Sequence, residues 1–417
     1  MIKRGSTPAL FVLAAIAVAG SALAQTQAPA QTPGQPAAAA TPPPTWQQGR
    51  SPAATEGMSK LAPVAGPPVA AALEKLPVDK LKVPAGFKVE VFANGLANAR
   101  SLARGSEGTV FVGTRLVGRV YAITEKDGKR VVKTIAEKLH RPNGVAFKDG
   151  TLFVAELSRV LRYDDIEKKL DNPPEPKVIY EDLPRDEQHG WKFIGIGPDN
   201  KLYVPIGAPC NICEPPATHA QIRRINLDGS GAEVVARGVR NSVGFDWQPG
   251  TSDLWFTDNG RDWLSEAVPH DELNHLTKPG QEHFGFPYCH QGDLPDTEHG
   301  WGKNCADYTA PAAKMGPHSA SLGMRFYTGA MFPAQYRKAI FIARHGSWNK
   351  TVRIGGDIQV VTLNTDGSVA KTEDFLTGFL QDNAYVGRPV DLLVMPDGAL
   401  LVSDDYNGAV YRISYGG

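Results

Sequence analysis

The amino-acid sequence predicts an all-β fold, a six-bladed β-propeller built of four-stranded antiparallel blades. A short apolar segment bounded by turn residues recurs along the chain, and no stretch has the pattern of an amphipathic helix longer than about 12 residues. The central residues of the repeat are Val110, Leu152, Leu202, Leu254, Ile340 and Leu400, separated by 42, 50, 52, 86 and 60 residues. All but the fourth of these intervals fit a single blade. A β-sandwich, the alternative all-β fold, does not explain a period of about 50 residues.

The chain begins with the features of a secretory signal peptide. Lys3 and Arg4 precede an apolar run from Ala9 to Gly20, and Ala22-Leu23-Ala24 supplies the small residues that a signal peptidase requires. We therefore expect residues 1–24 to be cleaved and the mature protein to be periplasmic or secreted. The alternative is an uncleaved membrane anchor, which is disfavoured because the run is shorter than the roughly 18–20 residues that span a bilayer.

The composition divides the remaining chain into two parts. Residues 25–75 are rich in Pro, Ala, Gln and Thr, and such a segment buries too little apolar surface to fold, so we expect a disordered linker. Residues 76–417 form the expected propeller. Lys and Arg together number 44, as do Asp and Glu, so the formal net charge is zero. This balance argues against nucleic acid or an anionic membrane as the main partner, and we expect no stable membrane insertion.

Each repeat predicts at least one strand. The recurring apolar segments lie at residues 108–113, 150–155, 200–205, 252–257, 337–342 and 398–403. A further strand is expected shortly after several of them, at residues 118–122, 158–163, 221–225, 358–362 and 408–413. The longest interval contains residues 262–322, an irregular insertion rich in His, Pro and Gly.

All four cysteines lie in the exported part of the chain, where an oxidising compartment favours disulfides. Covalent haem attachment is excluded, because Glu214 and not His follows the Cys210-Asn211-Ile212-Cys213 motif. A zinc site would need two such pairs, or one pair with closely spaced His ligands. We expect two local bridges, Cys210–Cys213 and Cys289–Cys305.

Polar clusters flank the buried strands. In a propeller such flanking loops converge at one end of the central channel, although they lie far apart in sequence. The clusters are Gln188–Lys192, Gly238–Ser242, Asp258–Asp262, Ala343–Asn349 and Gly387–Asp391. Taken singly, each is also compatible with an ordinary surface turn.

The residue types in these clusters suggest a chemistry. His189 is a candidate general base, since an imidazole titrates near neutral pH. Arg240 can form paired hydrogen bonds with a carboxylate, with Asn241 donating beside it. The turn at residues 258–262 offers carboxylate, amide and backbone oxygens, the ligands that calcium prefers, and Asp271 lies close behind it in the sequence.

From about residue 81 to residue 415 the chain resembles the glucose/sorbosone dehydrogenase family, whose members use pyrroloquinoline quinone (PQQ) on a six-bladed propeller. The resemblance is carried by motifs that begin at His189, Gly238, Thr257, His270 and His345. Gly207-Ala-Pro-Cys-Asn-Ile-Cys213 and Gly285-Phe-Pro-Tyr-Cys289 resemble the sorbosone dehydrogenase branch more than the glucose branch.

The resemblance implies roles for particular residues. His189 would take the proton of the sugar hydroxyl. The cofactor would be bound by Arg240, Asn241, Asn259, Arg344 and Arg388. A calcium ion would be bound at Gly260 and Arg261 through backbone oxygens, with support from Asp271. The glucose enzymes have Pro where this chain has Arg261, and they have Lys near the position of Arg344 and His345.

The resemblance further implies a PQQ- and calcium-dependent oxidation of an aldose or sorbosone-like sugar at C1 to a lactone or acid. Electrons would pass to a soluble acceptor, a quinone or a cytochrome. The absence of a Rossmann fingerprint is consistent with a cofactor other than a nicotinamide. Two alternatives remain open at this point, namely a calcium-dependent propeller lactonase and a propeller that binds without catalysis.

Overall fold

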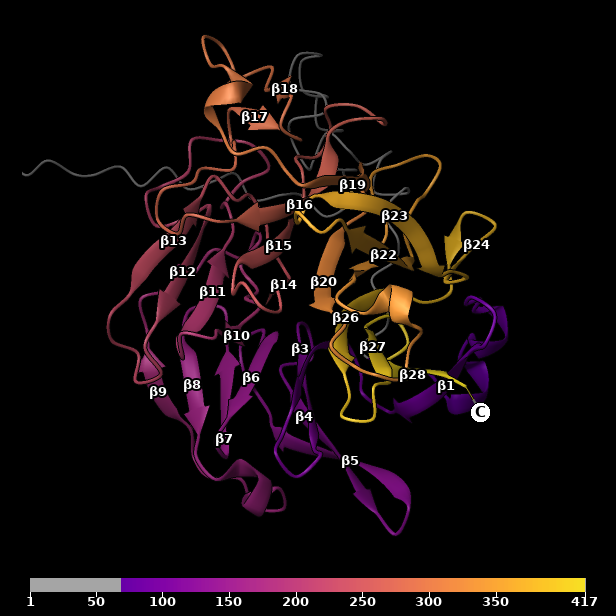
Figure 1. Ribbon diagram of the computed structural model, residues 1–417. Helices are drawn as coiled ribbons and strands as arrows, with labels where there is room; N and C mark the ends of the chain where they lie inside the picture. The colour runs from indigo at the N-terminus through magenta and orange to yellow at the C-terminus, as the bar shows by residue number, and fades with distance from the viewer. Residues whose placement is uncertain (1–68, 417) are drawn as a thin grey trace, which may run out of the picture.

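The computed structural model describes residues 69–416, and in this part of the chain six four-stranded antiparallel sheets form a ring (Figure 1). Each sheet is one blade, so the predicted six-bladed propeller is confirmed. The expected signal peptide and residues 25–68 of the expected linker lie outside the described residues.

The innermost strands surround the central axis. Among them, β2 contacts β6 and β26, and β20 contacts β14 and β26. Two of them are very short, since β10 has two residues and β14 has three. The six innermost strands are β2 (Ala99–Arg104), β6 (Gly144–Lys148), β10 (Gly195–Ile196), β14 (Phe245–Trp247), β20 (Ser321–Phe326) and β26 (Pro389–Val394).

The recurring apolar segments prove to be the second strand of each blade and not the innermost one. A second strand has a strand on either side and a neighbouring blade on either face, so it is the most completely buried. Every residue of β3, β7, β11, β15 and β27 is buried. The second strands are β3 (Val110–Thr114), β7 (Thr151–Ala155), β11 (Leu202–Ile206), β15 (Leu254–Asp258), β21 (Ile340–Arg344) and β27 (Leu400–Asp404).

The outer half of each blade consists of a third and a fourth strand. The third strands are β4 (Val120–Lys126), β8 (Val160–Tyr163), β12 (Gln221–Ile225), β16 (His270–Leu276), β22 (Asp357–Leu363) and β28 (Ala409–Tyr415). The fourth strands are β5 (Lys129–Ala136), β9 (Lys177–Tyr180), β13 (Glu233–Arg237), β19 (Ala313–Pro317), β23 (Val369–Leu376) and β1 (Phe87–Asn94).

The ring is closed by its first strand. β1 pairs antiparallel with β28, with Phe87 opposite Tyr415, and so becomes the outer strand of the last blade. The Phe87 ring makes edge contacts with Phe332 and Phe375 at centroid distances of 4.8 and 5.0 Å. Near the start of the described chain, the Ala71 N–H donates to the Asn407 carbonyl at 2.8 Å. The two ends of the described chain are therefore joined within one blade.

The long insertion expected at residues 262–322 contains two strands of the fourth blade, β16 and β19, and a lobe between them that projects from the ring (Figure 1). The lobe contains the hairpin of β17 (Cys289–His290) and β18 (Leu294–Pro295). Both expected disulfides are present, with Cys210–Cys213 in the third blade and Cys289–Cys305 in the lobe. The remaining short elements are η3 (Leu73–Lys75), η4 (Val78–Lys80), η5 (Ile166–Lys169), η6 (Cys305–Asp307), η7 (Ala334–Tyr336), β24 (Leu380–Gln381) and β25 (Ala384–Tyr385).

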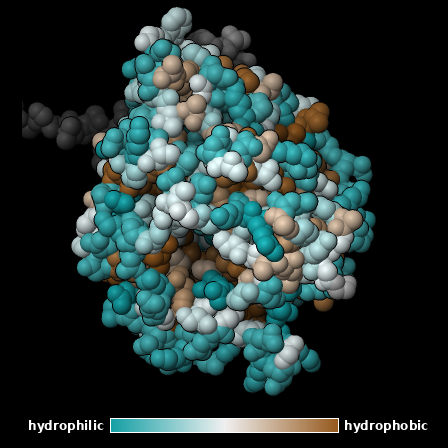
Figure 2. Space-filling view, in the orientation of Figure 1, coloured by the Kyte–Doolittle hydropathy of each residue, from teal (hydrophilic) through white to brown (hydrophobic). Residues whose placement is uncertain are grey.

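The surface of the ring seen in Figure 2 is mostly hydrophilic and is hollowed near its middle. Within residues 69–416, none of the helices combines the length and the apolar character needed to cross a bilayer.

Candidate functional site

A cavity of about 580 Å³ lies at one end of the ring and is lined by residues from all six blades. In an antiparallel meander, the loop that precedes the first strand and the loop that follows the second strand lie at the same end of the blade. The clusters predicted from the sequence occupy these two kinds of loop. Seven of the predicted residues line the cavity, namely His189, Arg240, Asn241, Asn259, Gly260, Asp271 and Arg388.

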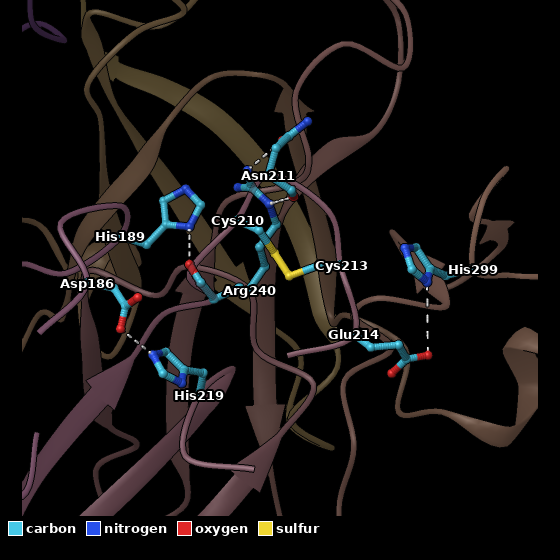
Figure 3. Close-up of a disulfide and its surroundings, with 10 residues drawn as sticks. Asp186, His189, Cys210, Asn211, Cys213, Glu214, His219, Arg240 and His299 are labelled. Carbon is cyan, nitrogen blue, oxygen red and sulfur yellow. Dashed lines mark hydrogen bonds and ion pairs between the residues drawn. A yellow bond between two sulfur atoms is a disulfide. The ribbon is translucent and has the colours of Figure 1, made fainter. Parts of the chain in front are cut away.

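His189 is held with one ring nitrogen bonded and the other unbonded. Its Nδ1 lies 2.8 Å from the Ala208 carbonyl oxygen, which can only accept, so Nδ1 carries the proton (Figure 3). Its position inside the cavity lowers the pKa of His189 well below the usual range, and the positive charge of Arg240 lowers it further. The imidazole is therefore neutral at pH 7, and Nε2 keeps a free lone pair with which to accept a proton.

The turn that carries His189 packs against the end of β11 at very short range. A Cβ atom added to Gly207 would lie 2.5 Å from the His189 Cβ and 2.8 Å from its backbone oxygen. His189 itself has a φ of 49°, in the left-handed region. Three residues after His189, the buried side chain of Lys192 donates from Nζ to the carbonyl oxygen of Gly190. Burial lowers the pKa of Lys192 to about 7.

Arg240 is almost completely buried, and each of its guanidinium nitrogens is bonded. Nε donates to the backbone oxygen of Asn211 at 2.8 Å, Nη2 donates to Asn211 Oδ1 at 2.9 Å, and Nη1 donates to the Asn259 carbonyl at 3.0 Å. Asp262 lies 3.3 Å from Nη2. These contacts fix the plane of the guanidinium at the wall of the cavity (Figure 3).

The loops of the fourth blade are joined through Asp258, the last residue of β15. Its carboxylate accepts from the backbone N–H groups of Arg240 at 2.7 Å and Asn241 at 2.6 Å. Asn259 Nδ2 donates to the Asn241 carbonyl at 2.9 Å. Asp271 accepts from the Gly260 N–H at 3.0 Å and from Ser319 Oγ at 2.9 Å. Apart from Arg261, the predicted cofactor and metal residues of this blade are thus parts of one hydrogen-bonded unit.

This hydrogen-bonded unit contains two residues of the predicted calcium site, Gly260 and Asp271. Asn259 Oδ1 is buried without a hydrogen-bond partner. Burial raises the pKa of Asp258 to about 7, and burial with the nearby Asp258 raises that of Glu272 to about 8. Within residues 69–416, no three His, Cys, Asp or Glu side chains are placed to hold a metal together. A cation here would therefore need amide and backbone oxygens, and the free Asn259 Oδ1 and surplus of buried carboxyl groups fit a hard cation.

Arg388 is a cavity residue, as predicted, whereas Arg344 and Arg261 are not among those that line it. Arg388 donates to the carbonyls of His345 at 3.0 Å and Gly346 at 2.7 Å. Arg344 is directed away because it ends β21 opposite Asp357, with which it forms a two-point ion pair. The Arg261 side chain points into the lobe, where Nη1 lies 2.6 Å from Asp296.

Sequence reasoning missed three arginines of the cavity, Arg100, Arg115 and Arg141. Arg115 stacks on the Trp191 ring at 3.6 Å, and its Nε is buried without a hydrogen-bond partner. Burial and the charges of Arg100 and Arg141 lower the pKa of Arg115 to about 9. A signal was present, because Arg115 directly follows β3 just as Asn259 directly follows β15.

Sequence reasoning also left the role of His345 open. Its Nε2 lies 2.8 Å from Asp405, which in turn lies 2.6 Å from Arg100 Nη1. Burial, with the charge of Arg388, lowers the pKa of His345 to about 4, so this imidazole too is neutral. Five arginines line the cavity, against the three carboxylate residues Glu187, Asp262 and Asp271. This surplus of positive charge, with a buried Arg115 Nε that lacks an acceptor, fits a flat ligand that carries several carboxylates.

The chain was compared with known proteins. It matches the family described as TrAA12-like over residues 81–416. An uncharacterized protein of Borreliella burgdorferi is 34% identical over 360 residues, which span 80% of this chain and 91% of that protein.

Solved structures with the same fold include the holo PQQ domain of pyranose dehydrogenase from Coprinopsis cinerea, with a TM-score of 0.69, 20% identity and coverage of 80% of this chain and 97% of that one. A calcium structure of a family AA12 carbohydrate-active enzyme from Trichoderma reesei has a TM-score of 0.69, 20% identity and coverage of 81% and 97%. The PQQ-bound aldose sugar dehydrogenase of Streptomyces coelicolor has a TM-score of 0.57, 19% identity and coverage of 80% and 99%.

At these identities the solved structures establish the fold, and the family match over residues 81–416 confirms the resemblance inferred from the motifs at the level of the family. The sorbosone dehydrogenase branch remains a prediction.

Proposed function

This chain belongs to the TrAA12-like family, and on that premise we propose that it is a PQQ-dependent dehydrogenase of sugars. The observation that carries the proposal is the state of His189. Its neutral ring keeps Nε2 free, and it lines a cavity shared with Arg100, Arg115, Arg240 and Arg388. A base poised beside a cluster of cations suits the removal of a proton from an alcohol next to an anionic cofactor.

The arginines would hold the cofactor. PQQ is a flat ortho-quinone with three carboxylates, and when bound it would supply the two-electron oxidant, polarised by calcium as a Lewis acid. Arg240 and Arg388 have guanidinium groups fixed by backbone carbonyls, so they can bind carboxylates with little loss of side-chain entropy. Asn241 and Asn259 would form hydrogen bonds to the cofactor beside these arginines. The backbone oxygens of Gly260 and Arg261 would face the calcium ion, and Asp271 would support that site.

His189 would act on the sugar. Nε2 would accept the hydroxyl proton of the substrate, while the bond from Nδ1–H to the Ala208 carbonyl keeps the tautomer fixed and favours the imidazolium that forms. Burial and the charge of Arg240 favour release of this proton afterwards, because both lower the pKa of His189. We propose that the oxidised position is C1 of an aldose or sorbosone-like sugar, giving a lactone or acid, with electrons leaving to a soluble acceptor or cytochrome.

We also propose that the protein acts outside the cytoplasm. The two disulfides support an oxidising compartment, in agreement with the leader expected at residues 1–24.

The proposal is tested by reconstitution. Purified apoprotein is incubated with PQQ and calcium, and reduction of an artificial dye is followed with a panel of aldoses and sorbosone. We expect dye reduction that requires both additions and at least one sugar. His189→Ala should lower kcat by about 10²–10⁴-fold while PQQ still binds. His299→Ala, which alters a histidine outside the cavity, serves as the control. Hydrolysis of lactones without dye reduction would establish the lactonase alternative, and binding without turnover of any sugar would establish the non-catalytic one.

A further inference from the structure

Asn211 lies inside the Cys210–Cys213 disulfide loop and joins two cavity residues, Arg240 and Asp262. Its backbone oxygen accepts from Arg240 Nε at 2.8 Å, and its Oδ1 accepts from Arg240 Nη2 at 2.9 Å. The same Oδ1 accepts from the Asp262 N–H at 2.7 Å, and Nδ2 donates to the Asp262 carbonyl at 3.0 Å. Asn211 thus provides hydrogen-bond partners for two guanidinium nitrogens of Arg240 and for both backbone polar groups of Asp262.

Asn211 does not itself line the cavity, whereas Arg240 and Asp262 do. It therefore acts through them. Without its two oxygens, Arg240 would keep a bond to the Asn259 carbonyl and the contact with Asp262, and its guanidinium could rotate about that pair. The direction in which Arg240 presents its charge to the cavity depends on Asn211.

Side chains anchor the loop that carries Asn211, since Cys210 and Ile212 pack against a small buried cluster and Glu214 accepts a hydrogen bond from the Tyr288 hydroxyl at 2.8 Å. Its backbone is not held in this way. Within the described chain, residues 209–214 belong to no helix or strand and form no backbone–backbone hydrogen bond. The disulfide joins cysteines only three positions apart, on either side of Asn211 and Ile212. A bridge over so short a loop gains less from loop closure in the unfolded chain than a bridge over a longer one. Its main effect is to restrict the backbone of these few residues, and so the direction of the Asn211 carbonyl.

We propose that the Cys210–Cys213 disulfide is a positioning device for the cavity, which fixes Asn211 so that Asn211 fixes Arg240 and the Asp262 turn. Arg240 meets an anionic ligand in the orientation that binds it most tightly only while the bridge is closed. The identity of that anion as PQQ rests on the proposed function, but the positioning itself does not.

The first test measures the positioning without any cofactor. Hydrogen exchange at the Asp262 amide reports directly on the bond to Asn211 Oδ1. We expect this amide to exchange about tenfold faster or more in Asn211→Ala and in Cys210→Ala/Cys213→Ala. The matched control is Cys289→Ala/Cys305→Ala, which removes the other bridge and should leave the Asp262 amide unchanged. An unchanged rate in both loop variants would overturn the inference.

The second test measures PQQ affinity of the apoprotein by calorimetry. We expect the Kd to rise about 10–100-fold in Asn211→Ala and in Cys210→Ala/Cys213→Ala, as for loss of hydrogen bonds to a charged group, and less than about twofold in the control pair. In an Arg240→Ala background, Asn211→Ala should cause almost no further rise in the Kd for PQQ, because Asn211 acts on the cofactor through that arginine. Full additivity of the two substitutions would contradict the proposal, since it would mean that Asn211 acts independently of Arg240.

Two further experiments distinguish a failure of the positioning from a failure to fold and from a failure of the proposed function. If Cys210→Ala/Cys213→Ala does not fold, mild reduction of folded Cys289→Ala/Cys305→Ala opens only the bridge around Asn211, and the same exchange and affinity changes are expected. If the wild-type protein binds no PQQ, the proposed function fails. The exchange of the Asp262 amide then decides the positioning alone.

Discussion

At the scale of single residues, the chemistry of the cavity depends on which nitrogen of His189 carries a proton. The Ala208 carbonyl fixes the proton on Nδ1, and the interior position together with Arg240 keeps the ring neutral. Neither factor can be read from the sequence around His189. The motif identified the residue, but its tautomer is set by a carbonyl 19 positions away.

A pH profile tests this state. Because the pKa of His189 is lowered in the folded protein, we expect kcat/KM of the reconstituted enzyme to stay on its plateau as the pH falls through 6.5. Activity should decline only at lower pH, where Nε2 becomes protonated and can no longer accept a proton. The comparison is His189→Ala, whose residual rate should lack this acidic limb. A limb centred at or above pH 6.5 would show that the cavity does not keep the ring neutral.

Lys192 offers a prediction about stability. Its pKa is lowered by burial to about 7 in the folded protein, against 10.5 for an exposed lysine. Between these two values the unfolded chain binds more protons than the folded one, so this residue makes the free energy of unfolding rise with pH. Urea unfolding at pH 7 and pH 9 should show a smaller rise for Lys192→Met than for the wild type. Lys168→Met, at an exposed site, should keep the wild-type dependence.

At the scale of elements, the two disulfides have different structural roles. Loop-closure entropy assigns about 2 kcal/mol to a bridge over three positions and about 3 kcal/mol to one over 16. The Cys289–Cys305 bridge is therefore expected to contribute more to the global free energy of folding, by holding the lobe together. The Cys210–Cys213 bridge acts mainly on the loop that contacts Arg240.

The close approach of the His189 turn to β11 gives an element-scale prediction. Gly207→Ala would place a methyl group against the Cβ and the backbone oxygen of His189, so the turn must move. We expect kcat to fall about 10–100-fold with little loss of helix- and strand-derived circular dichroism, because a misplaced base is costly. Gly108→Ala is the comparison. It strains a positive φ in open space and should lower stability by about 1 kcal/mol without lowering kcat.

At the scale of the whole molecule, the ring brings together residues from position 100 to position 388. Ring closure by β1 is the contact on which this depends, because the first and last segments of the chain share one blade. The Phe87 ring lies at this junction and contacts aromatic rings of Phe332, Phe375 and Tyr415.

Phe87→Ala should therefore weaken the closure. We expect the free energy of unfolding to fall by about 3 kcal/mol, the usual range for loss of a packed aromatic ring. Urea unfolding with far-ultraviolet circular dichroism measures this change, and Val131→Ala on an exposed outer strand should change stability by less than about 0.5 kcal/mol. An equal effect of the two substitutions would mean that the junction does not support the ring.

Much of the architecture could be predicted from the sequence alone. The second strands identified six blades because a strand enclosed on all sides is apolar at its centre, as in the Leu254-Trp255-Phe256 segment of β15. The innermost strands left no such pattern, since β10 and β14 are too short to show a period. The cysteine pairs could be assigned because both bridges are local.

What the sequence determined about this protein is thus the blade count, the disulfides and seven of the residues that line the cavity, because each depends on local patterns of burial and spacing. Tertiary structure alone decided that Arg100 joins the cavity, that Arg344 and Arg261 turn to Asp357 and Asp296, and that His189 is neutral. Those outcomes depend on which side chains meet across blades. A side chain near the axis is directed by neighbours that lie dozens of residues away, and its charge state is set by the field they create together.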